Sequence, residues 1–404
     1  MEMKKFTNFS FYFPTEIVFG KQVENQTAGL VKKYGGTKVM IVMDGGGFIK
    51  KSGLFDKITD NLRQAGLPFV ELEGVQPNPR LSLVYEGIRK LKAENADFVL
   101  AIGGGSTIDT AKAIALGMEY DGDVWDFYAK KAVPQKIGPV GVISTIAGSG
   151  SETSSGTVIL DDVKSQIKTG VMKDFVRPRF AIMNPELTYT LPAFQTASGA
   201  ADVLAHAFDT YFTDEASYLG DHFCTSVMRT AVKYGPIALE KPDDYEARAE
   251  LMLAASFAQN DTCRIGRARS PMTGGGHNLE RMSGLFDTTH GAGLAVMMPA
   301  FLQSLVDHDP DSHGRIAEFG VEVFDVCGEG KTRAQVAQEG VDRFRAWLKE
   351  MKMPSTLHEL LRREVTDEDI ERLVNTAWFT PGGKMRAFGT SSREDVRNMY
   401  LSVR

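Results

Sequence analysis

The sequence predicts a mostly parallel α/β domain followed by an all-helical domain. In the first half, short β-rich runs alternate with amphipathic helical segments, which is typical of a parallel sheet covered by helices on both faces. After Pro192 the strand signals nearly vanish. The length of 404 residues also exceeds what one hydrophobic core usually organises. We therefore expect two domains, at residues 1–192 and 193–404.

The elements of the first domain follow one another in order along the chain. Its strand-like runs are TEIVFG, TKVMIVMD, PFVELEGV, DFVLAIGGGS, PVGVIST and FAIMNPE, and its helical runs are SGLFDKITDNLRQAG, LSLVYEGIRKLKAENA and STIDTAKAIALGM. In the second domain, helical spacing of apolar residues predicts helices over 193–215, 219–239, 243–259, 291–308, 332–352, 356–363 and 367–378.

Composition excludes several classes of protein. With 46 basic and 52 acidic residues the net charge is −6, so no basic field favours nucleic acid or an anionic membrane. The three cysteines lie far apart and form no disulfide framework, which favours a reducing compartment. The N-terminal run FSFYF is too short for a signal-peptide core, and no apolar run reaches about 18 residues. We expect a cytoplasmic, soluble protein with no nucleic-acid or membrane partner.

A strand that stops at three glycines and restarts as a helix, VLAIGGGSTIDTAKAIA, predicts a phosphate site. Gly103, Gly104 and Gly105 permit close approach of a ligand to the backbone, and Ser106 stands where the helix begins. Free N–H groups and the helix dipole there favour a pyrophosphate. The loop is neither a Walker A loop nor G-x-G-x-x-G. A plain strand-to-helix turn is the alternative, although three glycines exceed what such a turn needs.

A second strand end, IVMDGGGFIKK, carries Asp44. In dinucleotide-binding folds, an acidic residue near a strand end can bind the adenosine ribose hydroxyls and reject a 2′-phosphate. A loop carboxylate that faces water fits the pattern equally well. Lys50 and Lys51 offer the opposite possibility, which is to hold a 2′-phosphate.

Four residues suggest a metal site. Asp202 and His206 stand one helical turn apart in the otherwise apolar stretch ADVLAHAF, and His277 and His290 fall in one segment, HNLERMSGLFDTTHGAG. A buried charge is costly unless it is paired or bound to a metal. One carboxylate and three imidazoles suit Fe(II) or Zn(II) with a position left open for substrate. Each histidine alone is more often a hydrogen-bonded core residue, but the four together favour a metal.

The chain closely resembles the iron-containing (group III) alcohol dehydrogenases, especially the butanol dehydrogenase branch. The resemblance runs nearly end to end, through NFSFYFPTEIVFGK, QPNPRLSLVYEG, AIGGGSTIDTAKAIA, STIAGSGSETSSGTVI, MNPELTYTLPAFQTASGAADVLAHAFDTYF and DTTHGAGLAVMMPAF. It implies a Rossmann-like N-terminal domain and a helical C-terminal domain, the dehydroquinate synthase-like architecture. It also implies a cleft that holds nicotinamide and metal, and we expect a homodimer.

The resemblance assigns roles to individual residues. It implies that Asp202, His206, His277 and His290 bind Fe(2+) or Zn(2+). The cofactor positions that we expect are Asp44, Gly45, Gly46, Gly104, Gly105, Ser106, Asp109, Thr145, Ser149, Ser154, Lys168 and Thr190. GGGFIKK is similar to the GGGSIKK of members that often take NADP, whereas Asp44 matches members associated with NAD. We expect NAD, with NADP possible, because a carboxylate beside a 2′-phosphate would repel it.

Three departures from the family pattern concern the segment around His277. The family usually has His-x-x-x-His here, but in this chain the residue four positions after His277 is Arg281. The spacing from His277 to His290 is one residue shorter than usual. The Asp-Trp pair that often precedes the first histidine is missing. A one-residue shift rotates a helical side chain by about 100°, so the intervening loop must compensate. Arg281 stays charged and is no proton shuttle. We expect it to act in catalysis by binding an anionic or polar substrate group, with a solvated surface residue as the alternative.

The predicted function is a metal-dependent alcohol dehydrogenase or aldehyde reductase. It would transfer hydride between a nicotinamide cofactor and a small primary alcohol or aldehyde, with the metal as Lewis acid. One alternative is an NAD- and metal-dependent lyase of the dehydroquinate synthase type, against which TASGAADVLAH and HGAGLAVMMP speak. Another is a cofactor-binding regulator that has lost catalysis, which metal analysis would distinguish.

Overall fold

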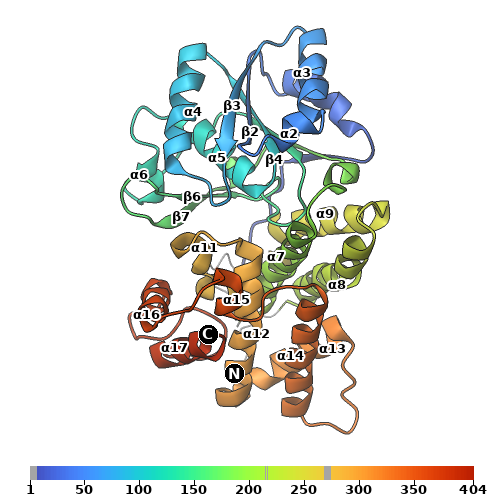
Figure 1. Cartoon of the computed structure of the whole chain (residues 1–404), viewed down its shortest axis with the longest axis vertical. Coiled ribbons are helices and arrows are strands. Elements are labelled where there is room, and N and C mark those ends of the chain that lie inside the picture. The colour runs from blue at the N-terminus through green and yellow to red at the C-terminus, as the bar shows by residue number, and fades with distance from the viewer. Residues whose placement is uncertain (1–6, 214, 216, 268–273) are drawn as a thin grey trace. The chain divides into compact units, whose positions relative to one another are not determined.

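The computed structural model describes residues 7–213, 215, 217–267 and 274–404 (Figure 1). The chain forms two compact units. One is Tyr12–Thr190, here called the sheet unit. The other is Leu191–Arg404 together with the N-terminal residues up to Phe11, here called the helical unit.

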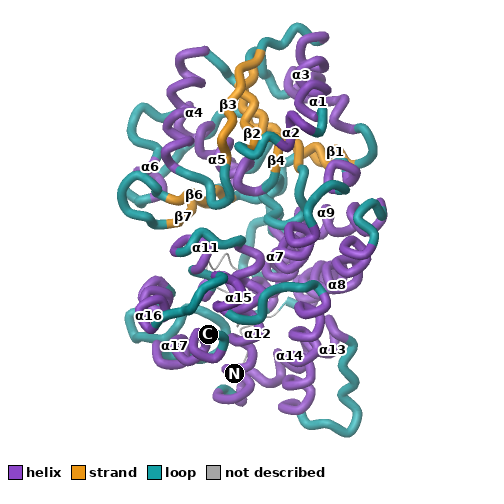
Figure 2. The backbone as a smooth tube through the Cα atoms, in the orientation of Figure 1, coloured by secondary structure: helices purple, strands orange, loops and turns teal. Residues whose placement is uncertain are grey.

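The sheet unit is built on six parallel strands in the order β1-β8-β5-β4-β2-β3 (orange in Figure 2). The strands are β1 (Glu16–Phe19), β2 (Val39–Asp44), β3 (Phe69–Val75), β4 (Phe98–Gly103), β5 (Val140–Ser144) and β8 (Phe180–Met183). All six coincide with strand-like runs of the sequence, and the predicted parallel α/β class is confirmed.

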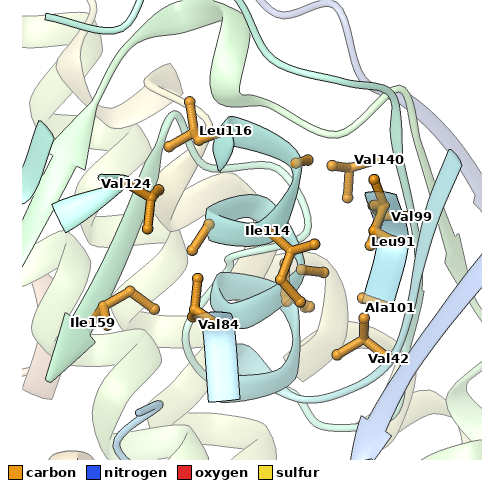
Figure 3. Packing of buried hydrophobic residues seen from close by; sticks show 14 of the residues in the cluster. Val42, Val84, Leu91, Val99, Ala101, Ile114, Leu116, Val124, Val140 and Ile159 are labelled. Carbon is orange, nitrogen blue, oxygen red and sulfur yellow. The ribbon is translucent and has the colours of Figure 1, made fainter. Parts of the chain in front are cut away.

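Helices cover both faces of this sheet, as the nearly continuous apolar strands require. Val42, Val99 and Ala101 pack against α4 (Leu81–Glu94) and α5 (Gly105–Met118), shown in Figure 3. The alternate strand residues form a second core cluster with the other face's helices. Those helices are α1 (Thr27–Lys33), α2 (Phe48–Lys51) and α3 (Leu54–Gln64), and α6 (Trp125–Tyr128) completes the α4–α5 face.

A two-stranded antiparallel hairpin stands apart from the main sheet and was not predicted. Its strands are β6 (Gly156–Leu160) and β7 (Lys168–Met172). Both strands are five residues long and lie between β5 and β8 in the chain. β6 (GTVIL) is an apolar run with four of its five residues buried, and the prediction overlooked it, whereas β7 (KTGVM) has one buried residue and does not meet the apolar-run criterion.

The helical unit confirms the expected change of class. Its helices are α7 (Ala193–Tyr211), α8 (Tyr218–Glu240), α9 (Tyr245–Gln259), α10 (Gly276–Leu279), α11 (Met282–Leu285), α12 (His290–His308), α13 (His313–Phe324), α14 (Arg333–Glu350), α15 (Leu357–Leu361), α16 (Asp367–Thr376) and α17 (Arg393–Ser402). Short 3₁₀ turns lie in this unit at Thr262–Arg264 and Pro310–Ser312. The sheet unit has such turns at Val23–Gln26, Asp174–Val176 and Pro185–Thr188. The first helix ends at Tyr211 rather than at the predicted 215, and α10, α11, α13 and α17 were not predicted.

The core of the helical unit is aromatic. Phe208 of α7 lies within 6.5 Å, centroid to centroid, of the rings of Phe212, Phe301, Phe319 and Phe344. Phe208, Phe301, Phe319 and Phe344 lie on α7, α12, α13 and α14, and Phe212 directly follows α7, so one cluster joins four helices. Among the described residues, no helix is long and apolar enough to cross a membrane.

Candidate metal centre and nucleotide-binding edge

The two glycine-rich strand ends lie side by side at the carboxyl edge of the sheet. Strand β2 pairs with β3 on one side and with β4 on the other, with Met43 opposite Ile102. Asp44 and Gly103, the next residues of the two strands, are therefore neighbours. The strand order reverses its direction of growth between β2 and β4, and ligands of open α/β sheets bind at the carboxyl ends of strands at such a switch point.

The glycine turn after β4 packs closely on the segment that follows β5. A Cβ on Gly104 would lie 2.8 Å from Cδ1 of Ile146, and one on Gly105 would overlap the Ser149 hydroxyl. The Thr145 N–H donates to the Gly103 carbonyl at 3.2 Å. Helix α5 begins at Gly105 with no side-chain cap, which leaves its first-turn N–H groups for an anion.

Asp44 has a structural role that sequence reasoning missed. Its carboxylate accepts bonds from the backbone N–H groups of Phe48 and Ile49, at 3.2 and 3.4 Å, and so holds the start of α2. Gly46 lies against the same carboxylate, since a Cβ there would be 3.1 Å from Oδ2. Gly45 approaches Gly74 of β3, whose Cα would be 3.0 Å from an added Cβ.

Lys50, which sequence analysis offered as a phosphate ligand, is paired with acidic side chains. Its Nζ lies 2.9 Å from Glu71 Oε2 and also pairs with Glu73. Hydrogen bonds to Glu73 and Glu71 raise the pKa of Lys50 to about 12. Lys51 lies in the same region, since its Cε would be 3.8 Å from a Cβ on Gly47, so two lysines share this region with Asp44, Glu71 and Glu73.

Three of the expected cofactor residues take part in packing the hairpin. The Asp109 carboxylate accepts the Val158 N–H at 2.9 Å, while Ser154 accepts from the buried Lys112 ammonium through its carbonyl and hydroxyl, at 3.0 and 3.1 Å. Lys168 on β7 donates to Asn78 Oδ1 at 2.8 Å. Thr190 is exposed at the last residue of the sheet unit. These contacts place Asp109 and Ser154 between α5 and the hairpin rather than in the glycine turn.

The four residues expected to bind metal come together in the helical unit. Ligand atoms of Asp202, His277 and His290 all lie within 4.8 Å of one another. His206 joins them, because its Nε2 is 3.3 Å from Asp202 Oδ1 and its ring centroid is 4.7 Å from that of His277. Helix α7 supplies the first pair, α10 supplies His277, and His290 is the first residue of α12.

The shortened spacing between His277 and His290 is absorbed by the chain between their helices. Helix α10 ends at Leu279, α11 follows, and α12 begins only at His290. The two rings lie 5.2 Å apart, centroid to centroid. The two histidines do not share a continuous helix, so the missing residue causes no 100° rotation at the cluster.

Each histidine engages a second side chain through Nδ1. His277 Nδ1 lies 2.6 Å from Asp209 Oδ2, and His290 Nδ1 lies 2.5 Å from Glu280 Oε2. His206 Nδ1 contacts the side-chain amide of Gln259. Sequence reasoning missed all three partners. Only Asp209 carried a signal, because it lies seven residues after Asp202 and three after His206, on the same helical face.

The cluster has the properties of a cation site. The Nε2 atoms of His206 and His277 are buried and have no hydrogen-bond partner among the described residues, which is costly without a ligand. Burial, and then the neighbouring His277, lower the pKa of His206 well below its ordinary value, so its imidazole is neutral, as a metal ligand must be. Burial opposes protonation of His277, but Asp209 outweighs it and raises the pKa of His277.

Arg281 lies within the packing of the helical unit. Its guanidinium sits 4.1 Å from the centroid of the Trp378 ring, and its Nε and Nη2 donate to the carbonyl and side-chain oxygens of Asn278, at 2.8 and 3.1 Å. Burial lowers its pKa. The side chain is half-buried and held by these contacts, and its expected role in binding substrate stays a prediction.

The sheet unit has a glycine turn at its switch point, and the helical unit has a cluster of three histidines and one carboxylate. This combination is typical of a two-domain enzyme that uses a nucleotide cofactor and a metal. Comparison with protein families is specific. Residues 14–185 match the model for iron-containing alcohol dehydrogenase, and residues 196–403 match that for the C-terminal part of the Fe-containing alcohol dehydrogenase family. The chain belongs to the iron-containing alcohol dehydrogenase family.

Similar proteins agree with this assignment. The chain is 36% and 38% identical to NADH-dependent butanol dehydrogenases A and B of Clostridium acetobutylicum, in both cases over 97% of this chain and 98% of the relative. The crystal structure of NADH-dependent butanol dehydrogenase A from Thermotoga maritima superposes with a TM-score of 0.89 at 34% identity, covering 98% of each chain. The dehydrogenase prediction is therefore supported over the lyase.

Proposed function

We propose that this protein is an NAD-dependent, metal-dependent dehydrogenase that interconverts small primary alcohols and aldehydes. The observation that carries the proposal is the convergence of Asp202, His206, His277 and His290, in which the buried Nε2 atoms of two histidines have no hydrogen-bond partner among the described residues. The relatives named as butanol dehydrogenases support a short, unbranched substrate.

In this proposal the cluster holds the metal. Asp202 is the one carboxylate among the four ligands, so it supplies the negative charge that directly contacts the metal. A bound Fe(2+) or Zn(2+) would polarise the substrate oxygen as a Lewis acid, which makes a strong protein base unnecessary. Neutral His206 and the carboxylate-supported His277 and His290 present ring nitrogens toward Asp202. The donor set accepts either metal. Arg281, held by Asn278 and Trp378, keeps its charge and supplies no proton.

The glycine turn would bind the cofactor pyrophosphate through the first-turn N–H groups of α5, at Gly105 and Ser106. Asp44, adjacent across the β2–β4 register, would accept bonds from the ribose hydroxyls while its other contacts hold α2. NAD rather than NADP is supported by the Asp44 carboxylate and by the pairing of Lys50 with Glu71 and Glu73. Nicotinamide carries the hydride in either direction.

We further propose that the protein is a cytoplasmic homodimer. The three free thiols, Cys224, Cys263 and Cys327, are typical of a reducing compartment. The dimer is an expectation from the family resemblance. Light scattering on the purified protein tests it, and a monomer at micromolar concentration would contradict it.

The decisive experiment combines metal analysis with turnover. Protein purified without oxygen is analysed for iron and zinc, then assayed with NAD and NADP on straight-chain primary alcohols and the corresponding aldehydes. We expect close to one divalent metal per chain and turnover that a chelator abolishes. Metal-free protein with full activity would overturn the metal role, and bound metal without any alcohol or aldehyde turnover would overturn the dehydrogenase assignment for this chain.

A further inference from the structure

Asp209 makes more contacts to the His277 segment than a simple ion pair would need. Its Oδ1 accepts the Gly276 N–H and its Oδ2 the His277 N–H, both at 3.0 Å, while Oδ2 also meets His277 Nδ1. Its backbone carbonyl accepts the Gly274 N–H at 2.6 Å. One residue of α7 therefore binds both the backbone and the side chain of the segment that delivers His277.

The glycines before His277 are explained by this contact. A Cβ on Gly274 would overlap Asp209, and one on Gly276 would lie 3.1 Å from Asp209 Oδ1 and 3.0 Å from Met298 Cγ. Gly275 is pressed against the Phe301 ring. The Gly-Gly-Gly-His run lets the backbone pass directly over Asp209, which places the His277 ring at the cluster.

Glu280 holds His290 in an equivalent way. Its side chain is buried, with 1% exposed. Its Oε1 accepts the Ser283 N–H at 2.8 Å, and its Oε2 accepts the Ser283 hydroxyl at 2.7 Å as well as facing His290 Nδ1. Gly293, one turn into α12, leaves room for this carboxylate, since a Cβ there would lie 2.6 Å from Oε1.

His206 differs from His277 and His290 in the side chain that contacts its Nδ1. Its Nδ1 meets the amide of Gln259, which can donate or accept and so does not select a tautomer. An ionised carboxylate only accepts, so Asp209 and Glu280 require a proton on Nδ1 of their histidines. Nε2 is then left as the lone-pair nitrogen of His277 and His290, and a carboxylate partner also makes the ring more basic.

We propose that Asp209 and Glu280 are positioning residues of the metal centre, which hold His277 and His290 in the tautomer with the proton on Nδ1 and fix the orientation of their rings. The inference rests on the proposed metal site and adds to it two residues that do not touch the ion. Replacing either carboxylate by its amide keeps the volume and removes the tautomer selection. The expected consequence is weaker metal binding rather than a different fold.

The test compares Asp209→Asn and Glu280→Gln with the wild type and with Asp369→Asn. Asp369 is a suitable control because its carboxylate is buried on α16 and pairs with Arg363, at 2.6 Å, rather than with a histidine. Zinc affinity is measured by chelator competition, and the Co(2+)-loaded proteins are compared by visible absorption. Near-ultraviolet circular dichroism of the metal-free proteins reports folding.

Asp209→Asn and Glu280→Gln are expected to bind zinc about 10- to 100-fold more weakly and to change the Co(2+) absorption, while Asp369→Asn matches the wild type in both. Zinc affinities of both variants within about twofold of the wild type would overturn the proposal. If Asp209→Asn does not fold, Glu280→Gln decides alone. Failure of the wild type to bind any divalent ion would instead overturn the metal centre itself.

Discussion

The carboxylate of Asp202 and the imidazole of His206 face each other one turn apart on α7, with Oδ1 3.3 Å from Nε2. Both lie on a helix that is otherwise almost entirely buried. Helix α7 alone sets the distance between these two side chains, whereas the other two histidines lie on separate segments. Metal binding should therefore depend on α7 more than on any other single element.

Replacement of His206 by Ala should remove bound metal and turnover while NAD binding persists. His206 supplies one of the four expected ligand atoms, whereas the glycine turn and Asp44 belong to the sheet unit. We expect at least about a tenfold loss of metal affinity. Metal analysis and titration of NADH fluorescence measure the two effects. Loss of NAD binding with metal retained would contradict this division of roles.

Gly291→Ala should disturb the cluster through the backbone. Gly291 follows His290 on α12, and a Cβ there would overlap the Ser198 carbonyl of α7. The helices must then separate, and with them His290 and Asp202. We expect a loss of about 1–3 kcal/mol in unfolding free energy and weaker zinc binding, measured by thermal unfolding with and without chelator.

Gly314→Ala is the matched control for that change. Gly314 lies on α13, and the nearest atom to an added Cβ, Arg333 Nη1, is 3.8 Å away. Alanine should be neutral or stabilise the helix by up to about 1 kcal/mol. If the two glycine variants lower the melting temperature equally, close packing of α12 on α7 is not what matters at Gly291.

Local patterns were enough to predict the strands that end at Asp44 and Gly103, because a buried parallel strand is a short apolar run whatever surrounds it. The same holds for α7, whose apolar spacing also exposed Asp202 and His206 as unusual. The metal quartet could be assembled from residue type together with family resemblance. Geometry then added what spacing cannot show, which is that His206 and His277 stack at 4.7 Å.

The missed features depend on contacts between segments far apart in sequence. Asp209 and His277 are 68 residues apart, so the helical face that Asp209 shares with Asp202 and His206 is its one local signal, and nothing local shows that its partner is His277. Asp109 sits in a recognised glycine-loop motif, yet its carboxylate binds the N–H of Val158 on an unpredicted hairpin. Lys50 looked like a free cation, because the two glutamates that pair with it lie on β3.

Lys112 should give the sheet unit a measurable pH dependence of stability. The ammonium is fully buried under the hairpin, where it donates to the carbonyls of Ser154 and Gly156. Burial lowers its pKa to about 8, although Asp109 and Glu152 favour the charged form and Arg177 opposes it. Below pH 8 the folded protein bears the cost of a buried charge. Between about 8 and the ordinary value near 10.4, only the unfolded chain is protonated, so stability rises with pH.

The comparison with Lys112→Met isolates this contribution. The variant lacks the titrating ammonium, so its stability does not share this dependence on pH. The stability of the wild type relative to the variant should rise between pH 7.5 and 9.5, by on the order of 1–2 kcal/mol. Urea unfolding followed by a signal from the sheet unit measures it. A constant difference across this range would show that Lys112 does not titrate there.

Cofactor choice should follow the charges at the end of β2. The Asp44 carboxylate would meet the ribose hydroxyls of NAD, but it would repel a 2′-phosphate by a few kcal/mol at short range and intermediate dielectric (about 332/εr). The wild type should thus prefer NAD by at least about tenfold in kcat/KM, and Asp44→Ser should narrow that ratio. A preference for NADP, or an unchanged ratio in Asp44→Ser, would leave Asp44 only its contacts to the start of α2.

The double variant Glu71→Gln/Glu73→Gln tests whether the pairing of Lys50 with these glutamates contributes to the preference for NAD. It frees Lys50, which both glutamates pair with in the wild type, without touching Asp44. Activity with NADP should rise several-fold while activity with NAD stays nearly constant, and adding Lys50→Ala should cancel the gain. If the gain survives Lys50→Ala, general loss of negative charge is responsible rather than release of the lysine. If no gain occurs, Lys50 lies out of reach of the 2′-phosphate, and Asp44 alone sets the preference.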